Sequence, residues 1–244
     1  MIMDEKIAKL KEMIYSSENI VFFGGAGVST ESGIPDFRSS DGIYNKKGYK
    51  VPPEVLISLS YFDEHPDEFY DFYKKHLIFP NAKPNKAHIA LAKLEKEGRL
   101  KAVVTQNVDG LHQAAGSKTV HELHGSVERN YCLSCGKKFD LKYIINSEGV
   151  PKCVSCGGII KPDVVLYEEP LDDRVMLRSI NAIESADMLI IGGTSLAVYP
   201  AAGLVRYFNG DKIVIINKSP TSYDDDADLL INKPIGETLG EIIK

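Results

Sequence analysis

The sequence predicts an α/β fold with a doubly wound parallel sheet and a second, smaller lobe. Two observations predict the sheet: short, wholly apolar runs end in turn residues, and segments with apolar residues at helical spacing lie between these runs. A third observation predicts the smaller lobe, because two stretches interrupt the alternation, one rich in aromatic and charged residues and one holding all four cysteines. The 244 residues suffice for one such core with a small lobe.

The first strand is predicted at residues 20–23, where four apolar residues are followed by glycines. A continuous apolar run is typical of a strand that is buried on both faces of a parallel sheet. The same pattern predicts strands at 102–105, 188–191 and 213–216. Ligands of such sheets bind at the carboxyl ends of the strands, so the residues that follow these runs are candidates for a site.

Helices are predicted between the strands. Residues 4–17 have apolar residues at helical spacing among lysines and glutamates. Pro84 lies at a position that suits the first turn of a further helix. The helices predicted after the first one span 84–97, 172–185 and 199–208.

The four cysteines form two Cys-x-x-Cys pairs, Cys132 with Cys135 and Cys153 with Cys156, separated by 17 residues. This spacing is typical of a zinc ribbon. Four thiolates fill a tetrahedral shell and leave no open position for water, so we expect one structural zinc ion rather than a catalytic one. A redox dithiol would need only one pair, and a nucleic-acid-binding ribbon would need a stronger basic and aromatic patch.

Two insertions thus interrupt the α/β alternation. Residues 39–83 are rich in Tyr, Phe, Asp, Glu and Lys, and predict a helical insertion module. Residues 127–160 predict the zinc-ribbon module. The rest of the chain is expected to form one Rossmann-like domain, assembled from residues 1–38, 84–126 and 161–244.

Composition excludes some classes of partner. The net charge is −5, from 29 basic and 34 acidic residues, and predicts no nucleic-acid-binding surface. No apolar run approaches the roughly 18 residues that a membrane span requires, and the charged N-terminus lacks the apolar region of a secretory signal. We therefore expect no membrane partner, and because the cysteines are paired for a metal rather than for disulfides, we expect a cytoplasmic location.

Gly25, Ala26 and Gly27 follow the first predicted strand and form half of a dinucleotide fingerprint. Small residues at such a turn let backbone N–H groups approach a pyrophosphate. The third glycine of the fingerprint is missing, because Thr30 stands there, and no acidic residue ends a second strand about 20 residues later. The turn favours phosphate binding but not an ordinary dehydrogenase, and a tight turn without a ligand is the alternative.

A dense set of hydrogen-bonding side chains also follows the strand at 102–105, within residues 105–112. Turn chemistry alone could place such residues there, so a binding role and a plain turn are both open. His121 and His124 are three residues apart, whereas the zinc motif H-E-x-x-H needs four. His124, followed by glycine at an expected junction of strand and helix, is interpreted as a general base, with a buried core histidine as the alternative.

Together the motifs resemble the sirtuin family of NAD-dependent protein lysine deacetylases, of the bacterial type with a four-cysteine zinc module. The resemblance covers about residues 5–236. It rests on six motifs in order, which are Gly25-Ala26-Gly27-Val28-Ser29, Gly33-Ile34-Pro35-Asp36-Phe37-Arg38, Thr105-Gln106-Asn107-Val108-Asp109, His124-Gly125-Ser126, the paired cysteines and Gly193-Thr194-Ser195. The resemblance implies transfer of the acetyl group of acetyl-lysine to ADP-ribose, with release of nicotinamide and free lysine, so that NAD is consumed as a co-substrate.

The resemblance also implies site residues within the Rossmann-like, NAD-binding domain. His124 is expected to be the base that acts on a ribose hydroxyl, and Asn107 is the second expected catalytic residue. Phe37 would cover the nicotinamide end and exclude water. The residues expected to contact NAD are Gly25, Ala26, Gly27, Thr30, Asp36, Phe37, Arg38, Gln106, Asn107, Val108, Asp109, His124, Gly193, Thr194, Ser195, Asn217, Lys218 and Ile235. The acetylated peptide is expected to add as a strand between segments that contain Val164, Val165, Leu166 and Val198.

Two departures from the family pattern bear on the substrate. Glu168 stands where the family commonly has glycine, which affects how residues that flank the acetyl-lysine fit. Family members that prefer acidic acyl groups have alanine near the position of Thr30 and a Tyr-x-x-Arg pair, but here Tyr73 is followed by His76. Without an arginine an acidic acyl group would be buried unpaired, so acetyl or a longer neutral acyl group is expected. A redox dehydrogenase and a non-enzymatic zinc-ribbon module are the alternative functions.

Overall fold

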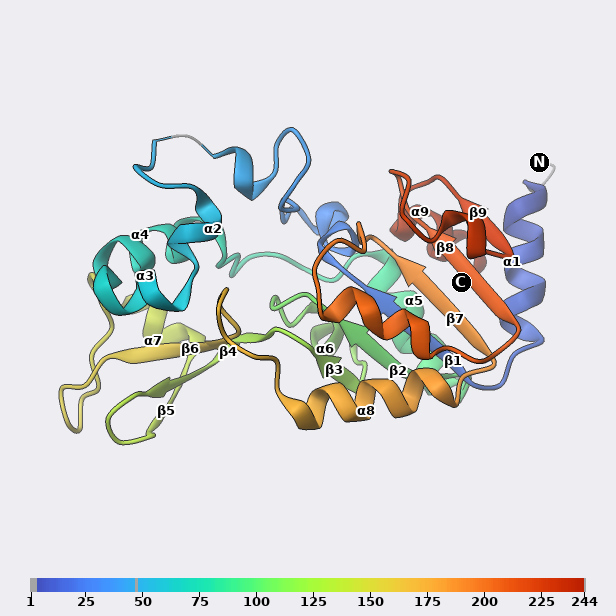
Figure 1. The fold of residues 1–244 in the computed structure, drawn as a ribbon. Helices are drawn as coiled ribbons and strands as arrows, with labels where there is room; N and C mark the ends of the chain where they lie inside the picture. Colours follow the sequence, from blue (N-terminus) through green and yellow to red (C-terminus); the bar gives the residue numbers. More distant parts are fainter. Residues whose placement is uncertain (1–3, 47, 244) are drawn as a thin grey trace.

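A computed structural model describes residues 4–46 and 48–243 and confirms the doubly wound α/β fold. Residues 1–3, 47 and 244, which the predicted domains include, lie outside the described residues. The main sheet has six parallel strands in the order β3-β2-β1-β7-β8-β9 (Figure 1). Their bounds are β1 Ile20–Gly24, β2 Leu100–Thr105, β3 Val120–Glu122, β7 Met188–Gly192, β8 Lys212–Ile216 and β9 Leu229–Ile231. The strand order reverses between β1 and β7, which is where such folds bind ligands.

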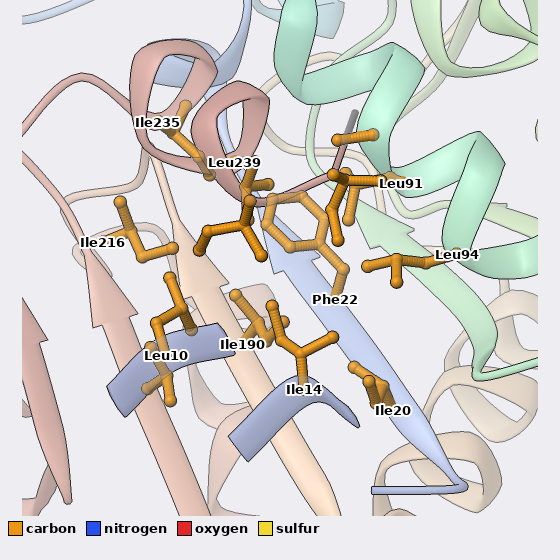
Figure 2. Packing of buried hydrophobic residues seen from close by; sticks show 14 of the residues in the cluster. Leu10, Ile14, Ile20, Phe22, Leu91, Leu94, Ile190, Ile216, Ile235 and Leu239 are labelled. Carbon is orange, nitrogen blue, oxygen red and sulfur yellow. The ribbon is translucent and has the colours of Figure 1, made fainter. Parts of the chain in front are cut away.

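Helices cover both faces of this sheet. The α-helices of the domain are α1 Glu5–Tyr15, α5 Lys86–Lys96, α6 Leu111–Ala115, α8 Asp173–Glu184 and α9 Ile235–Ile242. The 3-10 helices are η1 Ala26–Val28, η2 Thr30–Ser32, η4 Ala201–Tyr207 and η5 Asp224–Asp226. Phe22 of β1 packs among side chains of α1, α5 and α9 (Figure 2), whereas Phe23 lies in the cluster formed with α8 and η4. Because successive residues of β1 are buried on opposite faces, the strand is apolar throughout.

Two predicted helices differ from the structure. Helix α5 begins at Lys86, and Asn85 caps it by accepting a hydrogen bond from the N–H of Ala87 at 2.9 Å. Pro84 therefore precedes the cap, and its predicted place in the first turn is wrong because the asparagine provides the stronger start signal. The α-helix predicted at 199–208 is a 3-10 helix that begins after Pro200, in which the N–H of Gly203 donates to the Pro200 carbonyl three residues back.

The smaller lobe combines the helical insertion and the ribbon (Figure 1). Its elements are the 3-10 helix η3 Ile43–Asn45, helices α2 Pro53–Leu56, α3 Leu59–Glu64, α4 Pro66–His76 and α7 Leu141–Asn146, and strands β4 Gly125–Cys132, β5 Lys138–Asp140 and β6 Ile160–Val164. The three strands form one antiparallel sheet in the order β5-β4-β6. Aromatic residues of α4 share one buried cluster with Ile144 and Ile160, so insertion and ribbon have a common core. The predicted boundaries at 126/127 and 160/161 fall inside β4 and β6.

None of the helices in the described part of the chain has both the length and the apolar character needed to cross a bilayer.

Two histidines lie side by side in the interior. The ring centroids of His88 in α5 and His112 in α6 are 4.7 Å apart. Neither ring nitrogen of His112 has a hydrogen-bond partner among the described residues. Burial lowers the pKa of His112 to about 3, helped by the neighbouring His88, and lowers the pKa of His88 to about 4. Both rings are therefore neutral in the native protein at neutral pH.

Acidification should destabilise the protein through this pair. In the unfolded chain both histidines protonate near pH 6.5, whereas in the folded protein they stay neutral until about pH 4. Their contribution is fully present above pH 6.5 and is lost as pH falls toward 4, by about 2 to 3 kcal/mol between pH 7 and 5.5. Urea unfolding at both pH values measures this loss. His112→Leu should make the pH dependence shallower, and an unchanged slope in that variant would contradict the assignment.

Candidate active site

The glycine turn after β1 packs directly on the loop after β7. The N–H of Gly27 donates to the carbonyl of Gly193 at 2.8 Å. A side chain on Gly27 would place its Cβ 2.8 Å from the Gly193 Cα atom, and Gly193 has a left-handed φ of 59°. Only glycine fits at both positions. The contact brings the predicted phosphate residues 25–27 and 193–195 together at the carboxyl edge of the sheet.

The chain after this turn is not an α-helix. It continues as η1 and η2, two short 3-10 turns. Binding of a phosphate here would therefore depend on the N–H groups of the turn itself, because a single 3-10 turn has no helix dipole of useful size. The hydroxyl of Thr30 donates to the carbonyl of Gly27 at 3.0 Å and holds the turn closed.

Ser29 is the centre of a polar network between the loops that follow β1 and β2. Its hydroxyl donates to the Asp109 carboxylate at 2.6 Å and accepts from the Asn107 amide at 3.1 Å. Ser29 is only 1% exposed. Burial raises the pKa of Asp109, and hydrogen bonds from Ser29 and from the N–H of Leu111 oppose this shift. Ser29 was absent from the predicted site residues, although it belongs to the motif 25–29 and lies next to the predicted polar loop.

His124 lies beside this network. Its Nδ1 atom is 3.0 Å from the carbonyl oxygen of Gln106, whose side-chain amide donates to the Thr194 hydroxyl at 3.0 Å. Because a carbonyl only accepts, Nδ1 carries the proton in the neutral ring and Nε2 has a free lone pair. No described residue is hydrogen-bonded to Nε2. Burial lowers the pKa of His124, against the opposing effect of the Gln106 hydrogen bond, so the ring is a neutral base at pH 7.

The position of His124 differs from the prediction in one respect. It does not lie at a junction of strand and helix. It lies between β3 of the main sheet and β4 of the small lobe. Its own carbonyl accepts a hydrogen bond from the N–H of Val165 at 2.9 Å. The histidine is thus fixed at the junction of the two lobes.

Residues 36–44 form a loop that ends in η3. The Asp36 carboxylate accepts from the N–H groups of Arg38 and Ser39 at 3.1 and 2.8 Å, so it shapes the loop itself. The ring of Phe37 packs edge-on against Tyr44, with centroids 5.3 Å apart. The Arg38 guanidinium carbon lies 5.5 Å from the centre of the same tyrosine ring. The aromatic and cationic side chains predicted to cover a cofactor are therefore organised around one tyrosine.

Asn217 and Ile235 are further residues that the resemblance implies in contact with NAD. Asn217 follows β8, and its side-chain amide donates to the carbonyl of Ser219 at 2.7 Å. Ile235 is 3% exposed and its side chain belongs to the main core (Figure 2). The carboxylate of Glu31, which the sequence did not single out, accepts from the N–H groups of Gly236 and Glu237 and caps α9.

The segment predicted to hold a peptide connects His124 with the helical insertion. Val164 and Leu166 point into the small-lobe core, whereas Val165 is half-buried and Val198 lies half-buried after β7. The N–H of Tyr167 donates to the carbonyl of Ile57 at 3.1 Å, which ties the end of the segment to the insertion.

Glu168 adopts a left-handed backbone with φ of 76°, which explains why glycine suits this position in the family pattern. Its carboxylate accepts from the N–H and the hydroxyl of Ser60 at 2.9 and 3.0 Å. Since Ser60 lies in the first turn of α3, these bonds also stabilise the start of that helix. Where glycine would leave the backbone flexible, the Glu168 side chain thus makes a second connection between this segment and the helical insertion.

The four cysteines converge as predicted. The sulfur atoms of Cys132 and Cys156 are 3.4 Å apart, those of Cys135 and Cys153 are 3.7 Å apart, and all four lie within 4.8 Å of one another. A zinc ion with four sulfur ligands at about 2.3 Å needs separations of about 3.8 Å between them. The cysteines are therefore placed to bind one zinc ion. In both pairs the N–H of the glycine after the second cysteine donates to the carbonyl of the first, at 2.9 and 2.8 Å.

Comparisons with known proteins identify the relatives of this chain. The model of the Sir2 family matches residues 25–200. A protein of Clostridium perfringens strain 13 named NAD-dependent protein deacetylase is 65% identical over 243 residues, covering 99% of this chain and all of the relative. A solved structure of Sir2 with a deacetylated peptide and 3′-O-acetyl ADP ribose has a TM-score of 0.87 at 42% identity, covering 96% of this chain and 95% of that one. A further Sir2 structure, with a peptide and NAD⁺, has a TM-score of 0.84 at 41% identity, covering 97% and 96%.

Proposed function

The chain belongs to the Sir2 family, and we infer that it is an NAD-dependent protein lysine deacetylase. It transfers the acetyl group of acetyl-lysine to ADP-ribose and releases nicotinamide and free lysine. The observation that carries this inference is the neutral His124 ring, with Nδ1 fixed on the Gln106 carbonyl and Nε2 free, next to a buried polar network at the carboxyl edge of the sheet. Relatives that match the whole chain under that name favour this function over a dehydrogenase or a non-enzymatic zinc module.

The site residues have separate roles in this proposal. Bound NAD supplies a ribose carbon that the acyl oxygen can attack once nicotinamide leaves. Asn107 and Asp109, oriented by Ser29, hold the nicotinamide end of the co-substrate. Phe37 excludes water from the reacting centre. His124 accepts a proton at Nε2 from a ribose hydroxyl.

The other predicted contacts complete the NAD site. The glycine turn and the loop 193–195 hold the phosphates, and Asn217 with Lys218 holds the adenine ribose. Thr30, Asp36, Arg38, Gln106 and Val108 lie in the loops around the nicotinamide half, and Ile235 supports the adenine end only from the core side. We assign NAD binding to the domain made of 1–38, 84–126 and 161–244.

The proposed partner is an acetylated peptide that adds as a strand between the segments of residues 164–166 and Val198. Solved Sir2 structures with deacetylated and propionylated peptides support a peptide substrate. The proposal includes neither a nucleic acid nor a membrane partner. It places the reaction in the cytoplasm, because free cysteines arranged for zinc suit a reducing compartment.

Product analysis tests the proposal directly. The protein is incubated with NAD and an acetyl-lysine peptide, and nicotinamide and deacetylated peptide should appear in equal amounts. Nicotinamide should not accumulate at that rate when the peptide is left out. Absorbance of reduced NAD near 340 nm, a general property of that cofactor, or NAD binding without any turnover would favour one of the two alternatives instead.

The acyl preference gives a quantitative prediction. Tyr73 is fully buried and stacked on Phe69, and His76 is hydrogen-bonded to the Tyr49 hydroxyl at 2.7 Å. Partial burial lowers the pKa of His76, so neither side chain offers a positive charge to an acidic acyl group. A succinyl-lysine peptide should therefore react with a kcat/KM at least about a hundredfold below that of the acetyl peptide. Competition between the two peptides, measured by mass spectrometry, checks the ratio, and equal rates would refute the expected preference.

A further inference from the structure

Two tyrosine hydroxyls join the cofactor loop to the substrate segment. Tyr44 lies in η3 at the end of the loop 36–44, and Tyr167 directly follows the segment 164–166. Their hydroxyl groups are hydrogen-bonded to each other although the residues are 123 positions apart in the chain. Neither residue was singled out as a site residue from the sequence.

Tyr44 is fixed to the residues proposed to cover NAD. Its N–H donates to the carbonyl of Phe37 at 2.9 Å. Its ring contacts the Phe37 ring edge-on and lies beneath the Arg38 guanidinium. Burial and the hydrogen bond with Tyr167 raise the pKa of Tyr44, so the hydroxyl is always protonated at physiological pH. Because Tyr44 contacts both Phe37 and Arg38, a displacement of Tyr44 would move these two residues with it.

Tyr167 is fixed to the helical insertion by its main chain. Its N–H donates to the Ile57 carbonyl and its carbonyl accepts from the N–H of Leu59, at 3.1 and 3.0 Å. Two residues earlier, the N–H of Val165 donates to the His124 carbonyl. These hydrogen bonds hold the short main chain between the segment 164–166 and Tyr167 in place. A peptide that adds to this segment as a strand would therefore also affect the position of Tyr167.

We propose that the Tyr44–Tyr167 hydroxyl pair is a positioning link which couples binding of the acetyl-lysine peptide to the placement of Phe37 and Arg38 over NAD. The inference rests on the proposed deacetylase function and adds two residues that touch neither reacting atom. A hydroxyl pair suits this role because it is directional, neutral and lost completely on substitution by phenylalanine. Coupling of this kind is reciprocal, so NAD should tighten the peptide by the same factor as the peptide tightens NAD.

The link is tested by binding measurements with ADP-ribose, which lacks nicotinamide and does not react. Calorimetry gives its dissociation constant with and without saturating acetyl-lysine peptide for wild type, Tyr44→Phe, Tyr167→Phe and the double variant. Peptide should tighten ADP-ribose binding in wild type, and each single substitution should reduce that factor by about threefold to tenfold. The double variant should lose no more than either single one, because both remove the same bond.

Tyr61→Phe is the matched control, because the Tyr61 hydroxyl donates to the Glu68 carboxylate within the helical insertion alone. Melting temperatures of all variants separate loss of coupling from loss of fold. The link is overturned if coupling is absent in wild type, survives both substitutions, falls equally in the control, or falls in the double variant by the product of the two single losses. Deacetylation by wild type, measured in parallel, keeps these outcomes distinct: an active enzyme without the coupling refutes only the link, and an inactive one refutes the function.

Discussion

His124→Ala should lower kcat for NAD-dependent deacetylation by about a thousandfold while the dissociation constant of NAD changes little. General bases contribute roughly 10² to 10⁴ in rate, and His124 is a neutral imidazole at the junction of the two lobes whose Nε2 has no partner among the described residues. The ring binds the protein through its own Nδ1 contact with Gln106, so its removal deletes a base and leaves the Ser29 network intact. Steady-state kinetics with an acetyl-lysine peptide and calorimetry with NAD measure both quantities.

His121→Ala is the control for this substitution. His121 is also half-buried and lies three residues earlier in β3, but its Nδ1 faces Ser179 of α8 at 3.5 Å, outside the polar network. Its kcat should stay within about twofold of wild type. If His124→Ala retained more than a tenth of the wild-type rate, or if both variants lost activity alike, the assignment of His124 as the base would be wrong.

The sheet could be predicted largely because burial on both faces leaves a simple signature. β1, β2, β7 and β8 are apolar runs because helices cover both sides of each. The edge strands β3 and β9 are not predicted from the sequence, because each has only three residues. β3, Val120–Glu122, is also half-buried and mixed in polarity. The 3-10 form of η4 is likewise not predicted, because apolar spacing does not distinguish a tight helix from an α-helix over seven residues.

The site could be predicted as a set of motifs but not as a network. Sequence order places polar residues after strands, and parallel strands bring those ends to one edge. Ser29 and Asp109 are 80 residues apart, and Tyr44 and Tyr167 are 123 apart, so no local pattern specifies that these side chains meet. Asp36 shows the opposite case, because its hydrogen bonds to Arg38 and Ser39 are local and make it a loop-shaping residue. The Glu168 position could be flagged from sequence, but its backbone angle gives the reason.

Removal of zinc should unfold the small lobe, which is the largest effect on stability expected for this protein. Zinc contributes on the order of 10 kcal/mol to the folding of such a module, which is comparable to the whole stability of a domain. Cys132 and Cys153 are buried in the cluster that α4 shares with the ribbon, so loss of the ion should expose the aromatic core of the helical insertion as well. β6 ends at Val164, the first residue of the segment predicted to hold the peptide. The same unfolding should disrupt its pairing with β4.

The measurement compares melting and zinc content before and after dialysis against a chelator. Metal-free protein should lose the cooperative transition of the small lobe, bind no peptide, and regain both after one equivalent of zinc is added. Cys135→Ser should behave like the metal-free protein, because it removes one of four ligands. Val154→Ser is the matched control: it changes a side chain that is 71% exposed in the other Cys-x-x-Cys turn and removes no ligand, so zinc content and melting should stay at the wild-type values. Native melting of zinc-free protein would contradict the structural role of the ion, since the thiolates would then tolerate close approach without a positive charge between them.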